Sequence, residues 1–222
     1  MLINFHTHTP SNNEKVLSVV SFEPKQFKPE AITQSSNQFA TIGFHPWSIA
    51  DGSPNYDELS KILMSCKTIG LGEVGLDKLK GPTLEFQIQV FKKQLEIADK
   101  LNKPVIVHCV KAWNEIIAIK KKHFGTNPWA IHGFNGNFQL AEQLLDAGFY
   151  LSVGAALLNE ESKIRLALPK IPLNRLFLET DDRNVSIEAI YNEAAILLNL
   201  DKEQIEAQLQ NNFKEFFGIT LP

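Results

Sequence analysis

The chain is 222 residues long and carries a formal net charge of −3, with 22 lysines and arginines against 25 aspartates and glutamates. This balance argues against a protein that holds nucleic acid through a broad basic face. The two cysteines, Cys66 and Cys109, form no CxxC pattern, which argues against a disulfide scaffold and favours a reducing, cytoplasmic setting. Because no apolar run approaches the ~20 residues of a membrane span and no signal peptide is recognisable, we expect no membrane association.

Along the chain, short apolar runs alternate with helical patterns. Runs such as VIVH and LFLE are continuously apolar, which is typical of parallel strands buried on both faces. The eight predicted strands are Leu2–His6, Val16–Phe22, Phe39–Phe44, Thr68–Val74, Pro104–His108, Trp129–His132, Phe149–Val153 and Arg175–Glu179. Strands that alternate with helices favour a parallel architecture. We therefore predict one α/β domain, residues 1–222, with the fold of a TIM-type (β/α)8 barrel.

The clearest helical pattern covers Gly81–Asn102, where apolar residues recur at helical spacing from Leu84 to Ala98. The last predicted helix, Lys202–Phe217, begins after Asp201 as an N-cap. The other predicted helices are Tyr56–Cys66, Ala112–Phe124, Phe138–Ala147, Glu160–Leu168 and Ile187–Leu200.

The early part of the predicted barrel departs from a regular pattern. Only about nine residues separate the first two strands, whereas a parallel crossover normally needs about a dozen or more. The next link, Glu23–Gln38, contains Pro24 and Pro29 and is mostly irregular. We expect a barrel that is abbreviated or distorted around its first two strands, and the direction of the second strand stays open.

Six potential metal ligands lie at, or just beyond, the ends of predicted strands: His6, His8, Glu73, His108, His132 and Asp181. Parallel barrels build their active sites from residues at the carboxyl ends of several strands. His6 and His8 are two residues apart, so both would face one ligand from a strand. Imidazole together with carboxylate suits Zn²⁺, Mn²⁺, Fe²⁺ or Co²⁺, while Mg²⁺ usually prefers oxygen ligands. The pattern predicts one or two divalent metal ions, Mg²⁺, Mn²⁺ or Zn²⁺.

Any one of these residues, taken alone, is more often structural than functional. Glu73 could face solvent in a tight turn after its strand, and Asp181 could cap the following helix. Taken together, the residues favour a metal site over structural roles. Four of the six histidines end apolar runs, and His45 follows another apolar run. Glu73 between glycines would suit a carboxylate that bridges two cations, and Asp181 could accept a proton from a water activated by metal. We therefore predict Asp181 and Glu73 as catalytic residues.

Several motifs in the same order resemble the TatD family of metal-dependent hydrolases. They are HTH at the N-terminus, GFHP at 43–46, GEVGLD at 72–77, PVIVH at 104–108, IHGF at 131–134 and IPLNRLFLETD at 171–181. The resemblance runs over nearly the whole chain. It implies a TIM-type barrel and metal-dependent hydrolysis of phosphodiesters, as in a DNase.

The resemblance also implies how the ligands are shared. His6, His8, Glu73 and Asp181 would hold one metal, and Glu73, His108 and His132 would hold the other. His45 would contact the substrate phosphate. The expected substrates are DNA ends, short single strands or a small phosphodiester, and no obligate protein partner is inferred.

The chain departs from the family near the expected substrate. The family usually has an arginine two residues after the histidine of PVIVH, where this chain has Val110. Lys111 could substitute as a point charge, although lysine lacks the fork of arginine. Arg183 follows Asp181 where the family has ETDAP. We predict His45, Lys111 and Arg183 as substrate-binding residues; for the two basic side chains, ordinary solvated charge is an equal alternative.

Three other functions stay open at this stage. The same metal site could hydrolyse an amide, lactone or ester, as in the wider amidohydrolase group. The PHP phosphoesterases also begin with a His-x-His strand, but their last metal motif is Asp-x-His, and this chain has Asp181-Asp182-Arg183. A barrel that has lost activity and serves as a binding protein would be expected to lack some of the six ligands.

Overall fold

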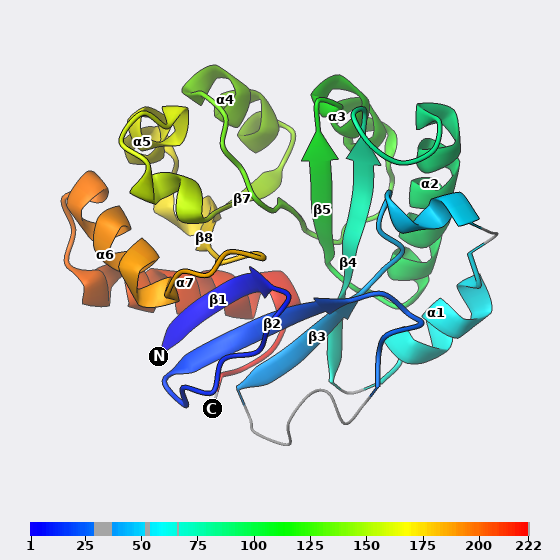
Figure 1. Cartoon of the computed structure of the whole chain (residues 1–222), viewed down its shortest axis with the longest axis horizontal. Coiled ribbons are helices and arrows are strands. Elements are labelled where there is room, and N and C mark those ends of the chain that lie inside the picture. Colours follow the sequence, from blue (N-terminus) through cyan, green and yellow to red (C-terminus); the bar gives the residue numbers. More distant parts are fainter. Residues whose placement is uncertain (29–36, 52–53, 66, 222) are drawn as a thin grey trace.

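A computed structural model describes residues 1–28, 37–51, 54–65 and 67–221 of the chain. Among these residues, eight strands form one sheet in sequence order, and each is parallel to its neighbours (Figure 1). The strands are β1 (Leu2–Thr7), β2 (Val16–Phe22), β3 (Gln38–Ile42), β4 (Thr68–Asp77), β5 (Val105–Val110), β6 (Trp129–Ile131), β7 (Phe149–Val153) and β8 (Leu176–Leu178). The predicted TIM-type barrel is confirmed. Of the two cysteines, Cys109 is a buried free thiol and Cys66 lies outside the described residues.

The first and last strands meet through the residues that follow them. The backbone N–H of Asp181 donates to the carbonyl of His6 at 3.0 Å, and the N–H of His8 donates to the carbonyl of Asp181 at 3.3 Å. Thr7 and Asp181 form an isolated parallel bridge. These contacts nearly close the barrel and bring Asp181, the last predicted ligand in the chain, next to His6 and His8, the first two.

The direction of the second strand is now settled: β2 is parallel to β1, with Leu2 opposite Val16. The link between the two strands, residues 8–15, contains no helix. Eight residues reach about 26 Å when extended, which is enough to return along a strand of about 20 Å. The barrel is therefore shortened at this point, as expected: a polar link without a helix connects β1 to β2 in place of a crossover helix.

Seven α-helices occur in the described residues: α1 (Tyr56–Leu63), α2 (Leu84–Lys100), α3 (Trp113–Lys122), α4 (Phe138–Asp146), α5 (Lys163–Ala167), α6 (Ile187–Leu198) and α7 (Lys202–Phe217). Four short 3₁₀ segments accompany them: η2 (Ser48–Asp51), η3 (Ala155–Leu158), η4 (Leu168–Lys170) and η5 (Leu173–Arg175). The predicted helix Glu160–Leu168 is shorter than expected: α5 begins at Lys163, after Ser162 at the N-cap, and ends at Ala167, where a 3₁₀ segment that contains Pro169 takes over. No helix in this part of the chain is both long and apolar enough to span a membrane.

The inside of the barrel is apolar and aromatic. Phe5 of β1 stacks on Phe177 of β8 with ring centroids 3.9 Å apart. Three phenylalanines of α7 join the same cluster. Since Gln210 of α7 donates to the carbonyl of Met1, this helix lies against the amino ends of the strands. That end of the barrel is therefore filled, and the open end is the other one.

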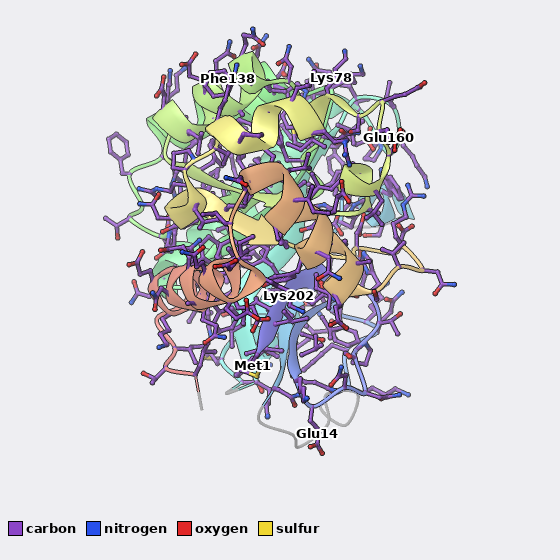
Figure 2. All side chains as sticks on the ribbon, turned by 90° about the vertical axis from the view of Figure 1, so that its left-hand side faces the viewer. Met1, Glu14, Lys78, Phe138, Glu160 and Lys202 are labelled. Carbon is purple, nitrogen blue, oxygen red and sulfur yellow. The ribbon has the colours of Figure 1, made fainter. Side chains whose placement is uncertain are left out.

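The two ends are separated in Figure 2. Met1 and Glu14, which precede β1 and β2, lie at the bottom of the view, whereas Lys78 and Phe138, which follow β4 and β6, lie at the top. The carboxyl ends of the strands, where all six predicted ligands occur, thus form the end that α7 does not cover.

Candidate metal centre

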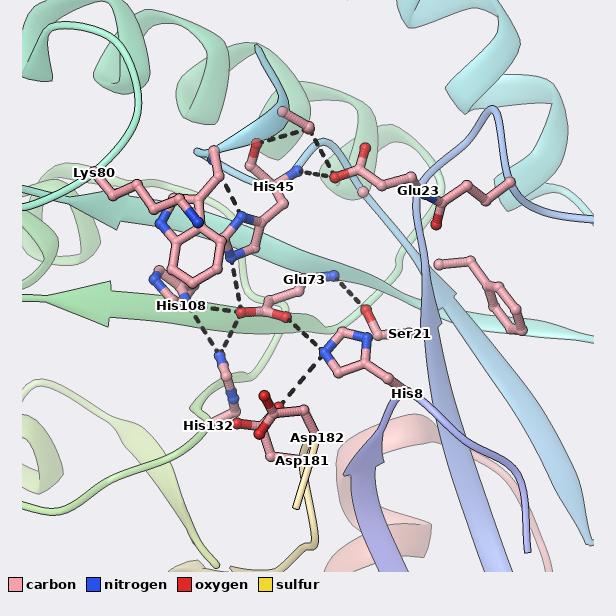
Figure 3. A pocket seen from close by; sticks show the side chains of 15 residues that line it. His8, Ser21, Glu23, His45, Glu73, Lys80, His108, His132, Asp181 and Asp182 are labelled. Atoms are coloured by element: carbon pink, nitrogen blue, oxygen red, sulfur yellow. Dashed lines mark hydrogen bonds and ion pairs between the residues drawn. The ribbon is translucent and has the colours of Figure 1, made fainter. Parts of the chain in front are cut away.

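A pocket of about 480 Å³ opens at the carboxyl ends of the strands (Figure 3). Its lining comes from segments far apart in the sequence: His8, Ser21, Phe22, Glu23, Gln26, Gly43, His45, Trp47, Ser48, Glu73, Lys80, His108, His132, Asp181 and Asp182. Five of the six predicted ligands lie in this lining, and the sixth, His6, is fully buried directly beneath it.

Glu73 of β4 lies at the centre of the pocket, and its two carboxylate oxygens face different groups. Oε2 is 3.4 Å from Nε2 of His6 and 3.5 Å from Nε2 of His8. Oε1 is 2.6 Å from Nδ1 of His108 and 2.7 Å from Nε2 of His132. One carboxylate thus separates two histidine pairs, which is the arrangement expected of a bridging ligand.

The backbone of β4 makes this position possible. The N–H of Glu73 donates to the Ser21 hydroxyl at 3.0 Å, which ties the strand to β2. Gly75 has φ +150°, and a Cβ there would collide with the carbonyl oxygen of His108. Glycine at this position therefore allows β4 and β5 to approach closely where Glu73 and His108 meet.

Asp181 completes the first histidine pair. Its Oδ1 lies 3.6 Å from Nε2 of His6 and 3.5 Å from Nε2 of His8. Asp181 has φ +54°, a left-handed conformation that costs a non-glycine residue about 1 kcal/mol. The hydrogen bonds to β1 compensate for this strain and turn the carboxylate toward the two histidines.

The side chains fit a cation because some of their ligand atoms lack other partners. Neither ring nitrogen of the buried His6 has a hydrogen-bond partner among the described residues. Two ligand atoms that share one tetrahedral Zn²⁺ lie about 3.4 Å apart, given bonds of about 2.1 Å. The separations of His6 and His8 from Glu73 match this spacing. Three ligand groups are close enough to share an ion: His6–Glu73–His132, His6–His8–Asp181 and His45–Glu73–His108.

Charge in the pocket is strongly coupled. Burial alone would raise the pKa of Glu73, but the charge of His132 and hydrogen bonds from the neighbouring histidines hold it well below its usual range. Burial would likewise raise the pKa of Asp181, but the neighbouring side chains of His6 and His8 hold it below its usual range. Hydrogen bonds to Asp181 and Glu73 raise the pKa of His8 to about 10. These shifts show that the two carboxylates favour positive charge beside them, which a divalent cation can supply.

Two further carboxylates support the second histidine pair from behind. Asp77 Oδ2 lies 3.4 Å from Nε2 of His108, and Glu179 Oε1 lies 3.6 Å from Nδ1 of His132. Glu179 is fully buried and also accepts a hydrogen bond from the N–H of Gly133 at 2.6 Å. Carboxylates behind ligand histidines orient the ring and raise its basicity.

Replacing Asp77 with asparagine is therefore expected to weaken metal binding at the His108 side about 10- to 100-fold, because the carboxylate behind the ring is lost. Competition with a fluorescent chelator measures the affinity. Trp47→Phe is the control, since it removes the other partner of Asp77 Oδ2, the indole N–H at 2.6 Å, and leaves the carboxylate in place. Equal affinity for Asp77→Asn and the unmodified protein would contradict the role given to this carboxylate.

Metal removal offers a second test. A chelator-treated protein is expected to gain about 5 to 10 °C in melting temperature when a binding divalent ion is added at about 100 times its Kd. The reason is that the ion binds the folded cluster of histidines and carboxylates, which the unfolded chain lacks. Differential scanning calorimetry measures the shift. An unchanged melting temperature with every divalent ion tested would show that the cluster holds no metal.

The three predicted substrate residues lie in different places. His45 lies in the pocket, with Nε2 3.0 Å from Glu73 Oε1. Lys111 follows β5 as an exposed residue with φ +57° and does not line the pocket. Arg183 is 70% exposed, pairs with Asp182 at 3.3 Å and faces a neighbouring hollow.

Sequence reasoning passed over several residues of the site, and four of them matter for its chemistry. Glu23 and Trp47 line the pocket from loops after β2 and β3, and Lys80 lines it from the loop after β4. Asp77, behind His108, is part of the GEVGLD motif. Their position in the sequence could have indicated them, because each follows a predicted strand, as the ligands do.

A parallel barrel with four histidines and two carboxylates gathered in one pocket defines the class of metal-dependent hydrolases. A family model described as TatD related DNase matches residues 11–218, so the chain belongs to this family.

Two sequence relatives support the assignment. The chain is 28% identical over 199 residues to an uncharacterized metal-dependent hydrolase, YjjV, of Escherichia coli K12, covering 82% of this chain and 77% of the relative. It is also 28% identical over 205 residues to the 3′-5′ ssDNA/RNA exonuclease TatD of Citrobacter rodentium, covering 82% and 78%.

Solved structures agree on the fold. The crystal structure of E. coli YjjV matches with a TM-score of 0.87 and 22% identity over 98% of both chains. A dihydroorotase from Campylobacter jejuni matches with a TM-score of 0.60 and 15% identity, covering 99% of this chain and 83% of that enzyme.

Proposed function

We propose that this metal-dependent hydrolase is a two-metal phosphodiesterase that cleaves single-stranded nucleic acid at its ends. The observation that carries the proposal is Glu73, whose two oxygens face separate histidine pairs. Cations that share one carboxylate lie about 3.5–4 Å apart, as in nucleases and phosphatases. His6, His8 and Asp181 would complete one site, and His108 and His132 the other.

The chemistry of the site suits phosphoryl transfer. When bound, the divalent ions supply charge that polarises the phosphoryl group and lowers the pKa of water. Asp181 is placed to accept the proton of the attacking water at a carboxylate oxygen, since its low pKa keeps it ionised.

His45 suits a phosphate contact better than a metal. Its Nδ1 accepts a hydrogen bond from the backbone N–H of Trp47 at 3.1 Å, so the neutral ring carries its proton on Nε2. Burial lowers the pKa of His45, which favours this neutral form. Nε2–H then points toward Glu73 and the centre of the pocket, where it can donate to a phosphate oxygen.

The family description and the relative named as a single-strand DNA and RNA exonuclease support a nucleic acid substrate. Because the net charge is −3, the chain offers no broad excess of basic residues to attract a phosphate. The bound cations would supply that positive charge instead. We propose that all 222 residues act as one domain. The cytoplasmic location and the absence of an obligate protein partner stay predictions.

Cleavage assays test the proposal. Protein treated with EDTA is expected to leave a 5′-labelled single-stranded oligonucleotide intact, and Mg²⁺ or Mn²⁺ is expected to restore shortening from one end. Bis(p-nitrophenyl) phosphate serves as the minimal substrate. If metal-loaded protein hydrolyses neither compound, the proposed function is wrong.

One observation favours a second function. Glu23, Asp181 and Asp182 make the pocket rich in carboxylates, which suits a neutral amide, lactone or ester better than a polyanion. The same cations would then polarise a carbonyl. Comparing kcat/KM on acyl and phosphodiester panels separates the two, and a higher value on an acyl substrate would favour this alternative.

A further inference from the structure

The active-site pocket contains one basic side chain that the ligand pattern does not explain. Among the described residues that line it, Lys80 is the only lysine or arginine. It faces a lining that contains the carboxylates of Glu23, Glu73, Asp181 and Asp182. A single cation at the entrance of an acidic pocket has a large effect on where an anionic substrate can lie.

The backbone of Lys80 is held in place by the residues that support the metal centre. Its N–H donates to Asp77 Oδ1 at 3.1 Å, and its carbonyl accepts from Nε2 of Gln87 at 3.3 Å. Gly81 has φ +95°, and a Cβ there would collide with the carbonyl oxygen of Pro46. The loop after β4 therefore packs directly against the loop after β3.

The side chain is also oriented. Nζ of Lys80 lies 3.6 Å from the centroid of the Trp47 ring, within the range of a cation–π contact. The Trp47 ring is anchored by its N–H to Asp77 Oδ2 at 2.6 Å, and its centroid is 5.6 Å from that of His108. The amine is thus positioned beside the histidine cluster at the rim of the pocket, where Trp47 is 43% exposed.

The ammonium group of Lys80 is free to donate hydrogen bonds to a ligand. In the described part of the chain, Nζ of Lys80 makes no hydrogen bond or ion pair, although four carboxylates line the same pocket. Lys78, two residues earlier, is different: it is paired with Glu115 at 2.7 Å and lies outside the pocket. A lysine that is oriented but unpaired suits a phosphate oxygen, for which lysine acts as a point charge.

We propose that Lys80 binds a phosphate next to the one being cleaved, so that it sets the position of a single strand relative to the metal centre. The inference rests on the proposed phosphodiesterase function and deepens it. The rim position beside the cluster, rather than within it, favours a neighbouring phosphate over the scissile one. A substrate with only one phosphodiester would not reach this contact.

Binding and cleavage together test the proposal. A fluorescein-labelled tetrathymidylate with phosphorothioate linkages, which resist hydrolysis, is titrated with Mn²⁺-loaded protein and followed by anisotropy. Lys80→Gln is expected to weaken Kd about tenfold, because a charge-assisted hydrogen bond is lost. The slope of log Kd against log salt concentration is expected to fall by about 0.7, the value for one phosphate contact with a single strand. Lys80→Arg keeps the charge and is expected to bind within about threefold of the unmodified protein.

Lys78→Gln is the matched control, since it removes a charge from the same loop outside the pocket. If Lys80→Gln binds with the affinity and salt slope of the unmodified protein, or if Lys78→Gln weakens binding as much, the proposal is wrong. With bis(p-nitrophenyl) phosphate, Lys80→Gln is expected to keep its kcat/KM; an equal loss on this substrate would show that Lys80 acts on the scissile phosphate instead. If the protein cleaves no phosphodiester but Lys80→Gln still weakens binding as expected, the proposed phosphodiesterase function is wrong and the phosphate contact of Lys80 stands.

Discussion

Replacing Glu73 with glutamine is expected to remove metal binding and to lower kcat/KM by about a thousandfold or more. The amide keeps the shape of the side chain but has one neutral oxygen in place of two charged ones, so it cannot serve both histidine pairs. Metal ions supply several kcal/mol of transition-state stabilisation in hydrolases of this kind, and each 1.36 kcal/mol corresponds to a factor of ten in rate. Steady-state kinetics and metal content of the purified variant measure the two effects.

A control separates this loss from misfolding. Glu85→Gln makes the same chemical change on the exposed face of α2 and is expected to leave activity and metal content unchanged. Circular dichroism of Glu73→Gln should retain the barrel signal, because the backbone bond to Ser21 does not involve the carboxylate. Full metal content with near-normal activity would overturn the bridging role.

Replacing Asp181 with asparagine is expected to lower kcat about 100- to 10,000-fold, while KM changes much less. The carboxylate oxygen that accepts the proton of the attacking water is lost, and the amide has little basicity. The backbone contacts that join Asp181 to His6 and His8 do not depend on the side chain, so the fold should be retained. Single-turnover kinetics measure the chemical step directly.

Asp57→Asn, on the exposed first turn of α1, is the matched control for loss of one carboxylate. An Asp181→Asn enzyme with kcat within about threefold of the unmodified protein would show that the proton is taken elsewhere. A rise in KM at constant kcat would instead give Asp181 a role in substrate binding alone.

The fold was largely predictable because its strands are buried on both faces. Such strands read as continuous apolar runs, and VIVH and LFLE lie within or overlap β5 and β8. The same property made the site visible: a histidine or carboxylate at the end of an apolar run stands out, and parallel strands bring their carboxyl ends together. Glu73 and Asp181 could be found in this way without knowledge of their contacts.

Other features depend on contacts that no local pattern contains. The parallel direction of β2 is one of them, because an eight-residue link is long enough to allow it but its length does not decide between the two directions. Lys80 and Trp47 are distant in sequence, and Asp77 accepts hydrogen bonds from both of them in the folded chain. Lys111 and Arg183 follow strand ends like the ligands, yet a left-handed turn at Lys111 and solvent exposure at Arg183 keep both out of the pocket lining.

Crystals of the protein soaked in Mn²⁺ and measured for anomalous scattering test the two-metal proposal most directly. We expect two peaks about 3.5–4 Å apart on either side of Glu73. One should lie near Oε2 with His6, His8 and Asp181, and the other near Oε1 with His108 and His132. A single peak would contradict the bridging role of Glu73, and the absence of any peak in the pocket would contradict the metal centre itself.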